Sequence, residues 1–176
     1  MKKQIVIAIL AFGAFVLGTT NTQAQTATTT VNLILADVIS IDSGAAVGGV
    51  VDFNYTTAAD YNTAKSVTVA ESLLITSSTN FDVKVKSNGV NFLNGSNSIP
   101  VNVLQIKAVS GGTMTGTFNA ITLSNADQKL VAAADKGAKK SLSIEYSISA
   151  DKASTVLLGK PVGTYTQTVT YTATAI

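Results

Sequence analysis

Apolar and polar residues alternate along most of the chain beyond residue 25, in short runs separated by clusters of Gly, Asn, Ser and Asp. Because successive side chains of a β-strand point to opposite faces, alternation with a period of two predicts strands buried on one side only. The runs recur roughly every ten residues, so we expect about eight or nine strands. The predicted strands lie within residues 28–41, 50–55, 65–78, 80–87, 90–93, 101–110, 113–124, 141–150 and 163–176.

Helical patterns are almost absent from the sequence. The stretch 125–140 contains the run Ala132–Ala134, which favours helix, but Gly137 and the short length fit a surface loop or a single turn as well. Asn88-Gly89 and Asn94-Gly95 are strong turn signals between short strands. Many short strands with hardly any helix predict an all-β fold, and we expect an immunoglobulin-like antiparallel β-sandwich.

The last predicted strand, "GTYTQTVTYTATAI", alternates more strictly than any other and contains no charged residue. Every even position from Thr164 to Thr174 is threonine. The odd positions are more apolar, so Tyr165, Val169 and Tyr171 are expected to face the core. The threonines then form an outer face that favours β-structure and tolerates water.

The first residues of the chain have the pattern of a secretory signal peptide. Lys2 and Lys3 precede an apolar run from Ile5 to Leu17, and small and polar residues follow up to Ala24. We therefore expect a signal peptide at residues 1–24, cleavage after Ala24, and export from a bacterial cell to the periplasm, cell surface or medium. Residues 25–176 then form a single domain, with no membrane-spanning segment after cleavage.

Composition excludes several classes of function. All twelve basic residues are lysines and two lie in the signal peptide, so the ten acidic residues leave the exported chain close to neutral. The absence of arginine argues against a nucleic-acid-binding protein. With neither cysteine nor histidine, the chain also lacks disulfides, a thiol nucleophile, the usual general base and the commonest metal ligands.

The acidic residues do not form a recognisable catalytic or metal-binding pattern. They are scattered along the chain, and most occupy predicted turns or solvent-facing strand positions. Asp60 with Asn62, and Asn125 with Asp127, could contribute oxygen ligands to calcium, but such residues more often bond to the backbone of their own turn. We therefore expect that the protein has no catalytic, cofactor or metal site and that it is not an enzyme.

The C-terminal run resembles the last strand of bacterial pilin-like β-sandwiches, nearest to the spore coat protein U type of chaperone–usher pilin. That strand has the form Gly-[Thr/Ser]-Tyr-Thr-Asp-Thr-Val-Thr-Val-Thr-Val. Gln167 replaces its Asp, and the chain lacks the disulfide that such pilins usually carry. The matching positions are Gly163, Thr164, Tyr165, Thr166, Thr168, Val169 and Thr170.

The resemblance implies assembly by strand donation, in which an alternating extension of one subunit completes the sandwich of the next. The candidate donor is the segment 28–35, with Val31, Leu33 and Leu35 filling the acceptor. The same residues are also consistent with the first strand of the domain's own sandwich. In either arrangement the segment needs a covering partner, because an exposed uncharged strand is prone to aggregation.

Two functional hypotheses follow. The first is a non-enzymatic structural or adhesive cell-surface subunit of the pilin or fimbrial kind, whose partners are copies of itself or other surface subunits. The alternative is a monomeric secreted or envelope binding module, for example one that binds carbohydrate. Glycan stacking would then depend on Tyr55, Tyr61 and Phe92, the aromatic residues best suited to such a platform.

Overall fold

The computed structural model describes residues 28–43 and 49–176, which divide into two units at Leu35. The predicted signal peptide lies outside the described residues. Residues 28–35 contain no strand or helix. The unit from Ala36 to Ile176, called the sandwich below, contains the eleven strands of the described part of the chain.

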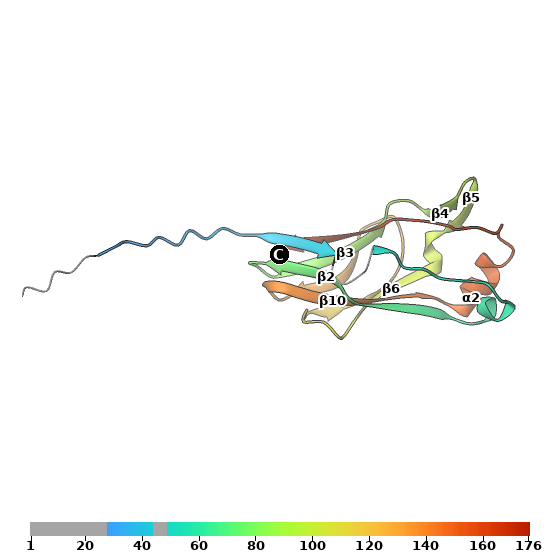
Figure 1. Cartoon of the computed structure of the whole chain (residues 1–176), viewed down its shortest axis with the longest axis horizontal. Coiled ribbons are helices and arrows are strands. Elements are labelled where there is room, and N and C mark those ends of the chain that lie inside the picture. The colour runs from blue at the N-terminus through green and yellow to red at the C-terminus, as the bar shows by residue number, and fades with distance from the viewer. Residues whose placement is uncertain (1–27, 44–48) are drawn as a thin grey trace, which may run out of the picture. The chain divides into compact units, whose positions relative to one another are not determined.

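The sandwich consists of two antiparallel sheets and a small hairpin (Figure 1). The first sheet has the order β1 (Ile39–Ser43), β2 (Lys65–Ser77), β10 (Gly137–Ile148), β6 (Leu104–Val109) and β8 (Ala120–Thr122). The second has the order β11 (Val169–Ala175), β3 (Phe81–Ser87), β9 (Gln128–Ala134) and β7 (Thr117–Phe118). The hairpin pairs β4 (Asn91–Asn94) with β5 (Asn97–Pro100). The predicted all-β antiparallel sandwich is therefore confirmed, with more and shorter strands than expected.

In residues 28–43 and 49–176, helical structure is confined to short segments between strands. These are η2 (Ala58–Asn62), η3 (Val101–Val103), α2 (Ala150–Lys152) and η4 (Ala153–Leu157). No helix among the described residues is long and apolar enough to cross a membrane.

The core lies between the two sheets and is mostly aliphatic. Alternate residues of each strand point into it, as the sequence pattern predicts. The first sheet contributes Ile75, Ile106, Leu142 and Ile144, and the second contributes Phe81, Val83, Leu130 and Val131.

One hydrogen bond joins the two sheets through the core. The hydroxyl of Tyr146 in β10 lies 2.7 Å from that of Tyr171 in β11. Burial, and secondarily the neighbouring Tyr146, raises the pKa of the Tyr171 hydroxyl far above its usual range. The Tyr171 hydroxyl therefore stays protonated at neutral pH, and its hydrogen-bond partner is the hydroxyl of Tyr146.

Three segments differ from their predicted structure, and one of them, residues 50–55, forms no strand. Residues 125–140 form β9 and the start of β10 in place of a helix or loop, because buried Leu130, Val131 and Ala134 are needed in the core. The predicted strand 28–41 is paired only from Ile39 onward, in β1.

Asp82 also departs from the expected pattern, since its strand was predicted to have one wet face. The residue as a whole is only 6% exposed. It accepts a hydrogen bond from the Ala133 backbone N–H at 2.9 Å and pairs with Lys129 Nζ at 2.6 Å. Ala133 has a positive φ of 51°, which locates a bulge in β9 at this point. The Lys129 bond and then the Ala133 bond lower the pKa of Asp82.

The tyrosine pair generates a stability prediction. We expect Tyr146→Phe and Tyr171→Phe each to lower the free energy of unfolding by about 1–3 kcal/mol, because each leaves a buried hydroxyl without a partner. The double variant should lose less than the sum of the two, since it removes both hydroxyls. Urea denaturation of all four proteins measures this coupling, and strictly additive losses would contradict it.

Candidate strand-pairing site

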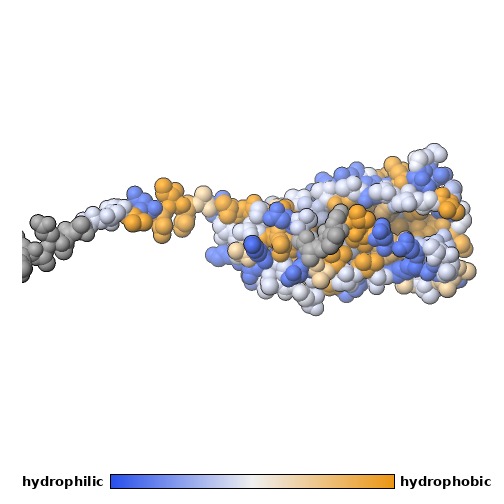
Figure 2. Space-filling view, viewed as in Figure 1, coloured by the Kyte–Doolittle hydropathy of each residue, from blue (hydrophilic) through white to orange (hydrophobic). Residues whose placement is uncertain are grey.

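The segment 28–35 presents its apolar residues to solvent. Val31, Leu33 and Leu35, the predicted donor residues, are 78%, 86% and 90% exposed. Ile34, of the opposite parity, is exposed as well. Figure 2 shows apolar side chains gathered on this part of the chain. Such exposure is unfavourable in water, so the segment has the properties of a strand that lacks a partner.

Among the described strands, the C-terminal strand β11 is hydrogen-bonded only to β3. It runs antiparallel to β3, from Val169 opposite Ser87 to Ala175 opposite Phe81, and it ends its sheet. Val169, Tyr171 and Ala173 pack against the core. Thr172 and Thr174 are exposed on the outer face.

The backbone groups on the free side of β11 can be identified from its bonds to β3. Thr168 accepts from the Asn88 N–H at 3.0 Å, and the Ile176 N–H donates to Asn80 at 2.9 Å. Both bonds involve even-numbered residues of the terminal run. Since bonding direction alternates along a strand, the odd-numbered residues from Val169 to Ala175 point their N–H and C=O groups to the free edge.

Tyr165 precedes the paired strand. It is half-buried, and its hydroxyl donates to the Pro161 carbonyl at 2.9 Å. The next residue, Thr166, exchanges two backbone hydrogen bonds of 3.0 Å with Leu93 in β4. The terminal run predicted as one strand is therefore divided, with its first part bonded to the hairpin and its second part to β3.

Among the strands that end a sheet, β11 offers the longest free edge. In the two main sheets the others are β1, β7 and β8, which have five, two and three residues, and the hairpin strands β4 and β5 have four each, whereas β11 has seven. β11 also contains no charge and no proline, the features that usually protect an edge. It is therefore the best-suited acceptor for an additional strand in the described part of the chain.

A second segment resembles a strand in its burial but not in its bonding. Val51, Phe53 and Tyr55 pack against the core, while Asp52 and Asn54 are exposed. No strand is assigned between residues 49 and 57. The Tyr55 hydroxyl is buried and has no hydrogen-bond partner in the structure, which is rare for a buried polar group.

The turn that follows this segment is organised around Asp60. Its Oδ2 accepts from the N–H groups of Thr56 and Thr57 at 2.8 and 2.7 Å, and Lys65 Nζ lies 2.7 Å from its Oδ1. The Lys65 bond, followed by the backbone bonds, holds the pKa of Asp60 well below its usual range. Asp60 thus bonds to its own turn, as the sequence predicts.

The aromatic residues of the carbohydrate hypothesis do not form one platform. Tyr55 and Tyr61 lie together, with ring centroids 5.2 Å apart and planes tilted by 41°. Lys65 Nζ lies 5.1 Å from the centre of the Tyr55 ring. Phe92 lies in β4 and packs against the core. Tyr55 and Phe92 thus pack against the core, and the three rings do not form one flat face.

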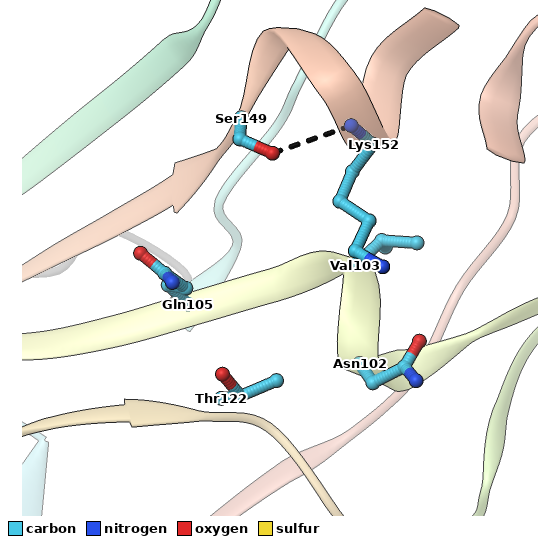
Figure 3. Close-up of a pocket in the computed structure, with 6 residues that line it drawn as sticks. All are labelled: Asn102, Val103, Gln105, Thr122, Ser149 and Lys152. Atoms are coloured by element: carbon cyan, nitrogen blue, oxygen red, sulfur yellow. Dashed lines mark hydrogen bonds between the residues drawn. The ribbon is translucent and has the colours of Figure 1, made fainter. Parts of the chain in front are cut away.

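The surface also contains a polar pocket of about 240 Å³ (Figure 3). Its lining consists of Asn102, Val103, Gln105, Thr122, Ser149 and Lys152. Ser149 Oγ accepts from the Lys152 backbone N–H at 3.2 Å and so caps the short helix α2. The pocket offers amide, hydroxyl and ammonium groups but no carboxylate.

The described carboxylates occur in ion pairs with lysines at three places: Asp60 with Lys65, Asp82 with Lys129, and Asp127 with Lys86. Within residues 28–43 and 49–176, no group of three or more acidic, His or Cys side chains lies close enough together to hold a metal ion.

No protein-family model matches the chain, and no curated protein matches it either.

The Asp60 turn predicts a pH-dependent contribution to stability. Because the folded-state pKa of Asp60 is lowered, its contribution is complete above the unfolded pKa of about 3.9 and is lost as the pH falls below that value. We expect Asp60→Asn to unfold more easily than the wild type at pH 7, with the difference shrinking below about pH 4.

Thermal unfolding between pH 2 and pH 7 measures this difference. Asp52→Asn, which removes an equal charge from an exposed neighbouring position, is the matched control. Equal losses of stability in the two variants at pH 7 would contradict the assigned role of Asp60.

Proposed function

We propose that this chain is an exported structural subunit of a bacterial cell surface, which assembles with copies of itself by strand pairing. The observation that carries the proposal is the coexistence of an exposed alternating segment, 28–35, with the free uncharged edge of β11. The signal-peptide pattern supports export, and the resemblance of the terminal run to pilin strands supports the same class of function.

The donor segment matches the acceptor edge in length and chemistry. Eight residues, 28–35, face the seven-residue strand β11. Val31, Leu33 and Leu35 share one parity, so one face of the added strand can be apolar throughout. Fully burying a Val or Leu side chain contributes about 1.5–3 kcal/mol, which together with the backbone hydrogen bonds of the added strand opposes the loss of conformational freedom on ordering the segment.

The added strand runs antiparallel to β11 in this proposal. All strand pairs recorded in the structure are antiparallel, and antiparallel pairing is slightly more stable per residue than parallel pairing. The odd-numbered residues of β11 supply the backbone bonds to the donor. Assembly therefore requires no rearrangement of the β3–β11 pair.

The donor can be tested by placing three negative charges either on its apolar face or on its opposite face. In the chain 25–176, we expect V31D/L33D/L35D to abolish assembly, because carboxylates cannot be buried on the acceptor. T28D/T30D/N32D adds the same three charges to the opposite face and should assemble as the wild type does. Light scattering after size-exclusion chromatography, with electron microscopy of the same samples, measures the outcome.

Two results would contradict the assignment of residues 28–35 as the donor strand. One is a wild-type chain that stays monomeric at all concentrations, with residues 28–35 protected from proteolysis, since the segment would then pair within its own chain. The other is an equal loss of assembly in both triple variants, since charge alone would then be responsible.

The acceptor edge allows a second test that leaves the donor intact. Proline at position 173 removes a backbone N–H from the free side of β11 and none from its bonds to β3. We expect Ala173→Pro to remain folded by circular dichroism but to lose at least tenfold in assembled material when mixed with the wild-type chain. Thr172→Pro, whose N–H points to β3, should instead destabilise the fold, and normal assembly of Ala173→Pro would exclude β11 as acceptor.

A further inference from the structure

The exposed large hydrophobic side chains of the sandwich are concentrated at its two opposite ends. One group lies where the chain enters β1, and we call it the β1 end. The other lies beside the β4–β5 hairpin, and we call it the hairpin end (Figure 1). The β1 end comprises Val38, Ile39 and Ile176, and the hairpin end comprises Val90, Leu93, Leu158 and Val162. Val50 is the one other such residue in the described part of the sandwich.

Backbone bonds hold the β1 end together around the turn between β2 and β3. The Ser78 N–H donates to the Val38 carbonyl at 2.9 Å, and the Ile176 N–H donates to the Asn80 carbonyl at 2.9 Å. Because Ser78 and Asn80 lie in the same turn, Val38 and Ile176 emerge side by side from the two sheets. Their exposed side chains have no covering partner within the sandwich.

The hairpin end is held together by contacts between β4 and the turn before the terminal strand. Leu93 is bonded to Thr166, and Asn94 lies against Gly163. Gly163 has a φ of 147°, and a Cβ there would stand 2.1 Å from Asn94 Nδ2, so a larger residue would be strained and would displace the Asn94 side chain. This contact fixes Val162, which is fully exposed, beside the hairpin. Figure 2 shows apolar side chains at this end of the sandwich.

The length of the connecting chain brings these two ends together in an assembly. β11 runs from the hairpin end toward the β1 end, so an antiparallel donor finishes, at Leu35, beside the hairpin end. Only residues 36–38 separate Leu35 from the first residue of β1. That connection spans at most about 14 Å even when fully extended. The donor's own sandwich must therefore lie directly against the hairpin end of the acceptor, and it presents its β1 end.

We propose that the hairpin end of one copy packs against the β1 end of the next, and that this apolar contact stiffens a directional, head-to-tail assembly. The proposal rests on the proposed strand pairing through residues 28–35 and adds a second interface to it. The two surfaces differ from each other, so each contact leaves one unused end of each kind. Such a heterologous interface propagates as a linear polymer unless it closes into a ring.

Cysteine pairs test the contact directly, because the natural chain contains no cysteine to interfere. V162C/I176C carries one thiol at each end. About a dozen residues of largely extended chain, on the order of 40 Å, separate the two positions, which is too far for a disulfide within one copy.

Under mild oxidation we expect a ladder of covalent oligomers on a non-reducing gel. T68C/I176C, with one thiol moved to an exposed position on the outer face of β2, is the matched control and should give at least tenfold fewer oligomers beyond the dimer.

A charge variant provides an independent measurement. We expect L158D/V162D to give shorter and more flexible assemblies in electron microscopy, while T68D/T122D, which adds the same charge to the outer sheet face, keeps the wild-type length. Wild-type assembly without a V162C/I176C ladder would overturn the end-to-end contact and leave strand pairing standing. Equal ladders from both cysteine pairs would also overturn it. Absence of any wild-type assembly would overturn both proposals.

Discussion

Side-chain packing holds the two sheets of this sandwich together without a disulfide, because the sequence contains no cysteine. The core is accordingly continuous and aliphatic, from Ile75 in β2 to Val131 in β9. The Tyr146–Tyr171 hydrogen bond supplies the one polar link across it between side chains of β10 and β11. Every other feature of the molecule, including the position of its free edges, depends on this packing being complete.

Packing also explains why β11 can serve two purposes at once. The side chains of its odd-numbered residues Val169, Tyr171 and Ala173 pack against the core. The backbone N–H and C=O groups of the same residues point away from β3. The strand is thus fixed by its side chains, while its odd-numbered backbone groups are not bonded to any other described strand. A protein that avoided association would place a lysine or a proline at such an edge, and β11 has neither.

The sequence was sufficient to predict the fold class, because period-two alternation and turn residues are local signals. It was sufficient for strands such as β2, β3 and the second half of β10, whose apolar faces are continuous. It failed at β9, where the alanine run favours helix locally and only the core contacts of Leu130 and Val131 impose a strand. It also failed at Asp82, whose burial depends on a bulge at Ala133 and on Lys129 from another strand.

The candidate site was predictable in part for the same reason. The alternation of apolar residues in 28–35 and the absence of charge in the terminal run are visible in the sequence. That β11 ends its sheet is a property of topology, which no local pattern encodes. The apolar ends were missed because Leu93, Leu158 and Val162 are isolated residues in turns and hairpins, and only folding brings them to one surface.

The direction of β11 has a mechanical consequence for the proposed assembly. Tension on a chain of subunits would enter each sandwich at β1 and leave it through a strand laid along β11, so the force would run parallel to both strands. Antiparallel backbone bonds lie perpendicular to the strands. Such a load shears all of the bonds together instead of opening them one at a time, and a surface filament built in this way would resist pulling far better than its small subunit contact suggests.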